Sequence, residues 1–155
     1  MIRDATSGEL PRLSALALRS KGHGGYAPGL LETFREELTW RAEDLGRVLL
    51  AWEGAPIGFH AVEFPAGEAA ELEALFVEPA RIGRGFGARL LADAVALARR
   101  AGRARLRIRS DPFAEAFSYP DHRAYALYLR STPRYRTEPD PEAEATGAPV
   151  LEPAQ

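Results

Sequence analysis

The chain has 155 residues, of which 46% are hydrophobic and 27% charged, as expected for one globular domain. Its formal net charge of −2 argues against a nucleic-acid partner. No run approaches the ~20 apolar residues that cross a bilayer, and the charged start of the chain argues against a signal peptide. We therefore expect a cytoplasmic protein that binds no membrane. The absence of cysteine excludes disulfides and thiolate chemistry, and with so few histidines we expect no metal.

The first part of the chain predicts two helices around a glycine-rich connection. Residues 2–5 indicate a short strand, and residues 9–18 place their leucines at helical spacing. Residues 21–29 are rich in glycine and contain a proline, which predicts a loop. A second helix with a mixed charged face is expected over residues 30–38.

The middle of the chain has strand character. Residues 48–53 and 57–64 are apolar runs joined by a short turn-like link, so they predict a β-hairpin. A third run, residues 70–77, ends just before a proline.

A clear amphipathic helix follows over residues 89–101, with arginines in its last turn and Gly102 in position to cap it. Strand character resumes at residues 104–108. Together with residues 70–77 this makes a βαβ unit and therefore a parallel pair. We expect one α/β domain over residues 1–138, and a Pro/Ala/Glu-rich segment over residues 139–155 that is an edge strand or disordered.

The turn between the third strand and the long helix reads Arg-Ile-Gly-Arg-Gly-Phe-Gly-Ala over residues 81–88. Closely spaced glycines let successive backbone N–H groups converge on an anion, and the helix start adds further donors and a positive dipole end. The turn predicts a phosphate site, with a tight β–α turn as the alternative. A P-loop would need a Gly-Lys-Ser/Thr ending, and this turn contains no lysine. A dinucleotide fingerprint would follow the first strand of its domain, whereas this turn comes mid-chain after the hairpin, so both of these phosphate motifs fit poorly.

This turn and its preceding strand resemble the GNAT superfamily of N-acetyltransferases. The family's turn reads Gln/Arg-x-x-Gly-x-Gly/Ala and follows a strand ending in Val-x-Pro. Here Val77-Glu78-Pro79 precedes the turn, and Ile82 fills the Gln/Arg slot. The resemblance runs from about residue 2 to residue 108. It implies a single-domain GNAT fold, with a mixed, mostly antiparallel sheet that is splayed at its central strands and flanked by helices.

The resemblance also implies acetyl-CoA as co-substrate and transfer of its acetyl group to a primary amine, on a small molecule or a peptide or protein N-terminus. A GNAT module that binds acyl-CoA without catalysis is the alternative, and a nucleotide-binding α/β module is a third interpretation. The residues assigned to acetyl-CoA are Leu75, Phe76, Val77, Ile82, Gly83, Arg84, Gly85, Phe86, Gly87 and Ala88.

Direct attack by an amine needs a general base and a general acid. Glu71 stands at the spacing before the turn that matches a glutamate base in the histone-acetylating branch of the family. Glu73 shares its face by the period of two of a strand. The alternative for both carboxylates is an exposed position or an ion pair.

For the acid, the family places a tyrosine in the pattern Asn-x-x-Ala-x-x-Phe/Leu-Tyr after its fifth strand. Residues 121–128 fill every slot, with Asp for Asn, on what would be a helix, and this favours Tyr128. The earlier segment 111–118 has Ser118 in the tyrosine slot and Tyr119 one residue later. Core packing is the other explanation for Tyr128.

The acceptor side is predicted more coarsely. The segment around His23 and Tyr26 looks like the substrate-side loop of one bacterial branch, and with Glu73 these residues are assigned to acceptor binding. A plain surface position is the alternative for His23. Arginines alternate along residues 103–109, which indicates a solvated face or one covered by a second subunit, so a homodimer is left open.

Overall fold

The computed structural model describes residues 1–23, 28–109, 124–128 and 134–137. Within these residues one seven-stranded sheet follows chain order. Neighbouring strands are antiparallel except for β4 and β5, which are parallel. The strands are β1 (Ile2–Asp4), β2 (Val48–Trp52), β3 (Pro56–Glu63), β4 (Ala69–Val77), β5 (Arg105–Arg109), β6 (Ala124–Tyr128) and β7 (Arg134–Thr137). The predicted α/β class and mixed sheet are confirmed.

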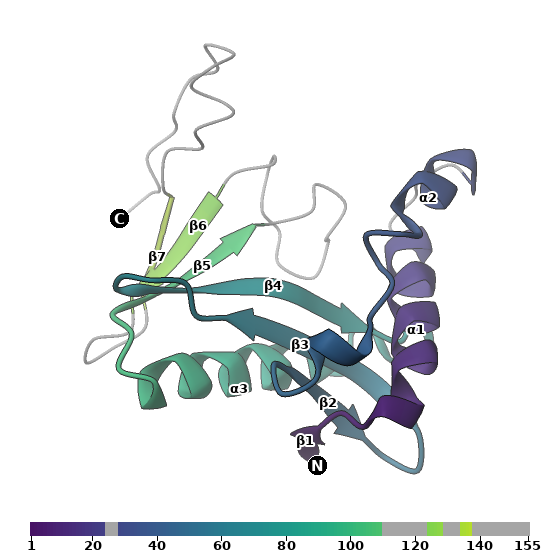
Figure 1. Cartoon of the computed structure of the whole chain (residues 1–155), viewed down its shortest axis with the longest axis horizontal. Helices are drawn as coiled ribbons and strands as arrows, with labels where there is room; N and C mark the ends of the chain where they lie inside the picture. Colours follow the sequence, from purple (N-terminus) through teal and green to yellow (C-terminus); the bar gives the residue numbers. More distant parts are fainter. Residues whose placement is uncertain (24–27, 110–123, 129–133, 138–155) are drawn as a thin grey trace.

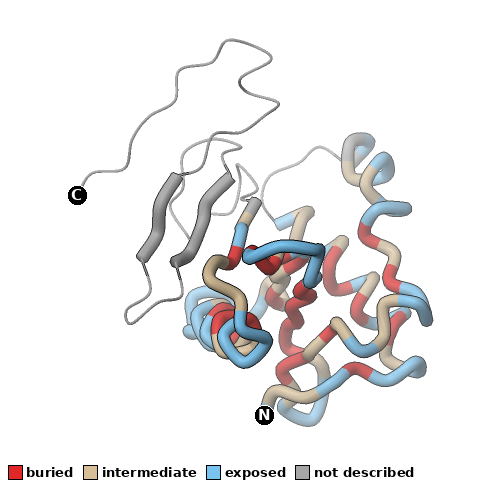
Figure 2. The backbone as a smooth tube through the Cα atoms, turned by 60° about the vertical axis from the view of Figure 1, so that its left-hand side comes forward, coloured by how far each residue is buried: buried red, intermediate tan, exposed pale blue. Residues whose placement is uncertain are grey.

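Helices cover both faces of this sheet (Figure 1). On one face α1 packs over the aromatic residues of the central strands, and on the other α3 packs over aliphatic side chains such as Val62, Ala70 and Leu72. The helices are α1 (Leu10–His23), α2 (Pro28–Phe34) and α3 (Phe86–Arg100), and short 3-10 turns are η1 (Ser7–Glu9), η2 (Ala42–Asp44) and η3 (Pro79–Arg81). Figure 2 shows the buried positions concentrated in the central strands and on the inner sides of α1 and α3.

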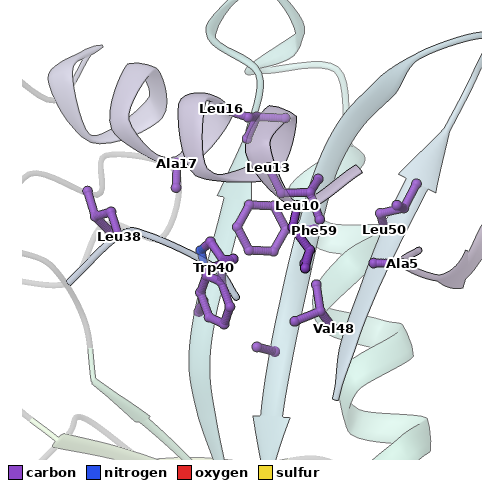
Figure 3. Close-up of a cluster of buried hydrophobic side chains, with 12 residues drawn as sticks. Ala5, Leu10, Leu13, Leu16, Ala17, Leu38, Trp40, Val48, Leu50 and Phe59 are labelled. Atoms are coloured by element: carbon purple, nitrogen blue, oxygen red, sulfur yellow. The ribbon is translucent and has the colours of Figure 1, made fainter. Parts of the chain in front are cut away.

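The face under α1 is built from large side chains. Phe59 is fully buried, meets the Trp40 ring edge-on at 5.3 Å between centroids, and lies 5.6 Å from the Phe76 ring. Figure 3 shows Phe59 and Trp40 beneath Leu13 and Leu16 of α1. The spacing of those leucines keeps one side of α1 apolar, which is why this helix forms and docks here.

The structure corrects the predicted loop over residues 21–29. Residues 21–23 continue α1, and residues 28–29 begin α2. A Cβ on Gly22 would come within 3.2 Å of Leu31 Cδ1, so the missing side chain permits close contact between α1 and α2. Proline is favoured in a first helical turn, which explains the early start of α2 at Pro28. Residues 35–38, predicted as helix, form turns.

The long helix starts earlier than predicted, at Phe86, and ends as expected. Gly102 has φ 73°. Its N–H donates to Arg99 O (2.9 Å) and the Arg103 N–H donates to Ala98 O (3.0 Å). This pair of bonds is the Schellman arrangement, which satisfies the last carbonyls of the helix.

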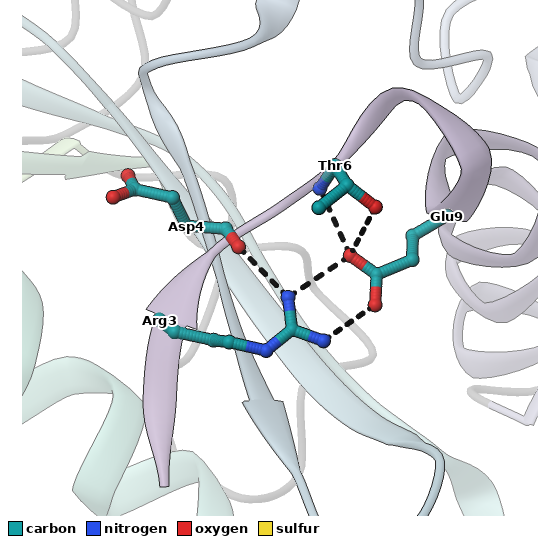
Figure 4. Close-up of polar contacts among 4 residues, drawn as sticks. All are labelled: Arg3, Asp4, Thr6 and Glu9. Carbon is teal, nitrogen blue, oxygen red and sulfur yellow. Dashed lines mark hydrogen bonds and ion pairs between the residues drawn. The ribbon is translucent and has the colours of Figure 1, made fainter.

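The entry into α1 is fixed by a carboxylate shared among several donors (Figure 4). Glu9 accepts hydrogen bonds from the Thr6 N–H and hydroxyl, both at 2.9 Å. Arg3 donates to the same carboxylate at 2.6 and 3.1 Å and to Asp4 O at 2.9 Å. The Arg3 guanidinium lowers the pKa of Glu9 to about 2. Thus β1 is joined to the first turn of the helical layer.

Residues 124–128 form the strand β6, so the helix predicted over residues 121–128 is wrong. β6 pairs with β5 on one side and β7 on the other, and these two ladders satisfy its backbone groups. Tertiary pairing here overrides a local pattern that favours a helix. Ser118, Tyr119 and the segment 139–155 lie outside the described residues.

Candidate functional site

The sheet opens between β4 and β5. Their parallel ladder ends at the pair Leu72 and Ile108, while β4 continues to Val77. On its other side, β4 stays paired with β3 as far as Val77. Figure 1 shows β5 turning away from β4 beyond this point. Among the residues that the structure describes, the second half of β4 therefore has an open edge, as the sequence resemblance implies.

Backbone direction decides which groups this open edge presents. The Glu78 N–H donates to Ile57 O at 2.7 Å, toward β3. Backbone groups alternate in direction along a strand, so the N–H of Phe76 also points toward β3. The N–H groups of Leu75 and Val77 therefore point to the open side. Of the three strand residues predicted to bind the cofactor, two thus have suitably directed donors.

The glycine-rich turn follows directly after η3. Gly83 has φ 79° and Gly85 has φ 85°, values that favour glycine. Gly85 is the N-cap of α3, and the first backbone bond of the helix runs from the Arg89 N–H to Gly85 O at 3.1 Å. The N–H groups that precede Arg89 have no carbonyl partner within the helix. Apart from the chain neighbours of each glycine, no described atom lies within 4 Å of a Cβ placed on Gly83 or Gly85, so no other part of the described chain packs against this side of the turn.

Two ion pairs hold the turn at both ends of η3. Arg19 of α1 makes a two-pronged contact with Glu78 at 3.0 and 2.7 Å, and this hydrogen bonding lowers the pKa of Glu78. Arg81 contacts Glu53 of the β2–β3 hairpin at 3.0 Å. Ile82, in the Gln/Arg slot of the family pattern, is 38% exposed.

Gly58 of β3 sets the position of α3 against the sheet. A Cβ at this residue would lie 2.6 Å from Phe76 O and 2.9 Å from Leu90 Cδ1. Only a glycine allows the helix that carries the turn to approach so closely. The donors of β4 and those of the turn are thereby held in one continuous run.

Both predicted carboxylates of β4 are engaged in ion pairs. Glu71 is 46% exposed and lies 3.7 Å from Arg107 of β5. Glu73 contacts Arg47, which precedes β2. The ion-pair interpretation left open by the sequence is thus the one found. Glu71 lies next to the point where β4 and β5 separate.

Tyr128, the predicted general acid, lies at the far end of the β4–β5 ladder from this opening. Tyr128 pairs with Arg105, and Arg105 pairs with Ala69 at the beginning of β4. Leu75 is further along β4, about 20 Å away at the ~3.3 Å rise per strand residue. His23 is exposed at the end of α1, and Tyr26 lies outside the described residues.

A buried pair that sequence reasoning missed lies on the α3 side. His60 of β3 is fully buried, and its Nε2 lies 2.7 Å from Asp93 Oδ2 of α3. Burial lowers the pKa of His60, and the Asp93 carboxylate opposes that shift. A histidine in an otherwise apolar strand and an aspartate near the buried side of the helix were the available signals. Among the described residues, no three His, Asp or Glu side chains are grouped to hold a metal.

The sequence matches the family described as the acetyltransferase (GNAT) family over residues 13–132. The chain belongs to this family. Membership assigns it to the acyltransferases that use coenzyme A. No curated protein matched the sequence. No helix in the described ranges is long and apolar enough to span a membrane.

Solved GNAT structures share the fold. The PaiA N-acetyltransferase of Thermoplasma acidophilum with coenzyme A is 22% identical, with a TM-score of 0.66 over 76% of this chain and 84% of that one. A GNAT family acetyltransferase of Brucella melitensis with acetyl-CoA is 19% identical, with a TM-score of 0.58 over 87% and 93%. N-acetylglutamate synthase of Neisseria gonorrhoeae is 26% identical, with a TM-score of 0.56, and is matched over 27% of its length and 76% of this chain.

Proposed function

We propose that the protein moves an acetyl group from acetyl-CoA to a primary amine by direct attack. The observation that carries this proposal is the open edge of β4, which runs without interruption into the glycine turn and the start of α3. Similar structures with bound coenzyme A or acetyl-CoA support the choice of donor.

Each part of acetyl-CoA finds complementary groups along this run. The pyrophosphate fits the unpaired N–H groups and the positive end of α3. The pantetheine arm is an extended chain with amide groups, and it can add to the edge of β4 through the N–H groups of Leu75 and Val77, much as a peptide adds to a sheet. In this arrangement, which is part of the proposal, the thioester lies in the opening between β4 and β5.

The reaction is then a direct displacement. The amine nitrogen attacks the thioester carbonyl carbon, the carbon–sulfur bond breaks, the amine loses a proton, and the thiolate gains one. A cysteine acyl intermediate is excluded because the chain has no cysteine. Glu71, beside the opening, is the candidate for accepting the amine proton. The amine acceptor, the cytoplasmic location and the homodimer remain predictions from the sequence.

Thiol release from acetyl-CoA across a library of primary amines tests the proposal, with mass spectrometry of the products. We expect amine-dependent release and an N-acetyl product, with sequential rather than ping-pong kinetics. Glu71→Gln should lower kcat by about a hundredfold if Glu71 is the base. Tyr119→Phe and Tyr128→Phe compare the two candidate general acids. We expect Tyr128→Phe to keep its activity, because Tyr128 lies far from the opening. A protein with no micromolar affinity for acetyl-CoA would contradict the proposal.

The second candidate is a GNAT module that binds acyl-CoA without catalysis. The ion pair between Glu71 and Arg107, together with the distant position of Tyr128, favours this candidate. Calorimetric binding of acetyl-CoA with no turnover of any amine would distinguish it from the enzyme.

A further inference from the structure

The strand that offers the open edge contains a β-bulge. Ala61 of β3 pairs with Ala74 of β4, and the next residue, Val62, pairs with Leu72. Glu73 is therefore an extra residue on β4 with no partner of its own. A bulge of this kind resets the alternation of side chains and backbone groups along a strand.

The burial of β4 shows this reset. Before the bulge, Ala70 and Leu72 pack with α3, and after it Leu75 packs on that same side. An uninterrupted strand would have kept Glu73 and Leu75 on one face. The bulge thus decides that Leu75 and Val77, and not Phe76, direct their N–H groups into the opening.

Arg47, which precedes β2, contacts both strands that meet at the bulge. Its backbone oxygen accepts a hydrogen bond from the Val62 N–H at 3.4 Å, directly beside the bulge. Its side chain contacts the Glu73 carboxylate, and its Nη1 lies 3.3 Å from Glu63. One residue therefore engages both strands at the point where their register shifts.

The guanidinium of Arg47 is itself fixed. It contacts Asp44 of η2, and its Cζ lies 5.5 Å from the centroid of the Trp40 ring. The side chain is 26% exposed. A guanidinium that already lies between an aromatic ring and several carboxylates loses little conformational entropy when it forms an ion pair with one of them.

We propose that Arg47 and Glu73 form a clamp that fixes the bulge of β4, so that Arg47 is a positioning residue for acyl transfer. Glu73 then acts through the backbone and is not an acceptor ligand. The inference rests on the proposed function for its kinetic consequence, because the clamp sets the N–H groups of Leu75 and Val77 against the thioester. Its structural consequence is independent of activity.

The structural consequence is measured by amide hydrogen exchange of Ala74 and Phe76, whose N–H groups face β3. Both Arg47→Gln and Glu73→Gln should speed exchange at these amides by about tenfold through local opening. Glu63→Gln is the matched control, because Glu63 touches the same guanidinium from a regular ladder position, and it should change exchange by less than about twofold. Unchanged exchange in the folded Glu73→Gln variant would overturn the clamp. So would an equal increase in Glu63→Gln.

The kinetic consequence separates positioning from binding. Arg47→Gln and Glu73→Gln should lower kcat by at least about tenfold, because small misplacements in a site are costly. The affinity for coenzyme A should change by less than about twofold, since the glycine turn is untouched. The double variant should be no slower than the slower single variant, because both changes remove one interaction. Additive losses, or a parallel loss of affinity, would overturn the positioning role.

The two levels fail separately. If the wild-type protein turns over no amine but the exchange results are as expected, the proposed function is wrong and the clamp stands. If the wild-type protein is active and the Arg47→Gln and Glu73→Gln variants retain full kcat, the positioning role is wrong and the proposed function stands.

Discussion

The two faces of the sheet are built in opposite ways. Under α1, the core consists of large rings and leucines, among them Phe59, Trp40 and Leu13. Under α3, it includes small residues such as Ala70, Ala94 and Ala98, and Gly58 lies against Leu90. Packing under α1 depends on large side chains that fill the space between helix and sheet. Packing under α3 depends on the close approach of the helix to the sheet.

This difference follows from what each helix carries. The start of α3 continues the glycine turn, so its distance from β4 sets the distance between the turn donors and the strand donors. A close, small-residue contact fixes that distance. The start of α1 carries no such turn, and its packing mainly supplies apolar burial. We therefore expect the two faces to fail differently when altered.

The largest expected effect is on the α1 face. Phe59→Ala removes a fully buried ring that contacts Trp40 and Phe76. We expect a loss of about 4 kcal/mol in the free energy of unfolding, from lost burial and the cavity left behind. Urea denaturation measures this loss, and Phe59→Leu should cost less. Coenzyme A affinity of the folded fraction should stay within about twofold of wild type; a larger drop would mean that the α1 face also sets the cofactor site.

Gly58→Ala tests the α3 face by overpacking. The added methyl group meets Phe76 O and Leu90, so helix or strand must shift. We expect a loss of about 2 kcal/mol in stability. Because the shift moves the turn relative to β4, coenzyme A affinity should fall about tenfold. Gly8→Ala is the control, since a Cβ there meets no atom within 4 Å. Unchanged affinity in Gly58→Ala would remove the distinction between the faces.

The sequence predicts the elements that have strong local signals. The strand end at Val77, the turn glycines and the helix stop at Gly102 lie where their residue types require. The clean period of the long helix predicts its body, but not its early start at Phe86. Gly87 has a low helix propensity, so the sequence signal for the helix begins only after it.

Features that depend on pairing across the sheet could not be predicted. The strand β6 has a sequence that also fits a helix, and only the ladders with β5 and β7 decide it. The bulge at Glu73 is visible in the sequence as a change of spacing, because the α3-facing apolar residues Leu72 and Leu75 are three positions apart and not two. Reading that change requires knowledge of which face is buried. The partners of Arg47 and His60 depend on the same register.

The α3 face should respond to pH near neutrality. Burial lowers the pKa of the His60 imidazole below its ordinary value of about 6.5, so the unfolded chain binds a proton at a higher pH than the folded one. The contribution of neutral His60 to the free energy of unfolding is therefore fully present above about pH 6.5 and declines as the pH falls below that value. His60→Gln should flatten this decline in urea denaturation between pH 7 and 5. His23→Gln, at an exposed position, is the control. An equal slope in wild type and His60→Gln would contradict this expectation.

The smallest effect is expected at the entry to α1. The hydrogen bond from Arg3 is the main cause that lowers the pKa of Glu9 from its ordinary value of 4.5 to about 2. Its contribution to stability is therefore present above about pH 4.5 and is lost as the pH falls toward 2. Glu9→Gln should cost about 1 kcal/mol at pH 7, as the loss of a capping interaction does.

The same variant should show a weaker acid dependence below pH 4.5, because its side chain no longer gains a proton on unfolding. Glu32→Gln is the matched control, since Glu32 also pairs with an arginine but at an exposed position on α2. We expect no measurable stability loss there, as for most surface ion pairs. If the two variants lost the same stability, the half-buried carboxylate at the helix entry would have no special role.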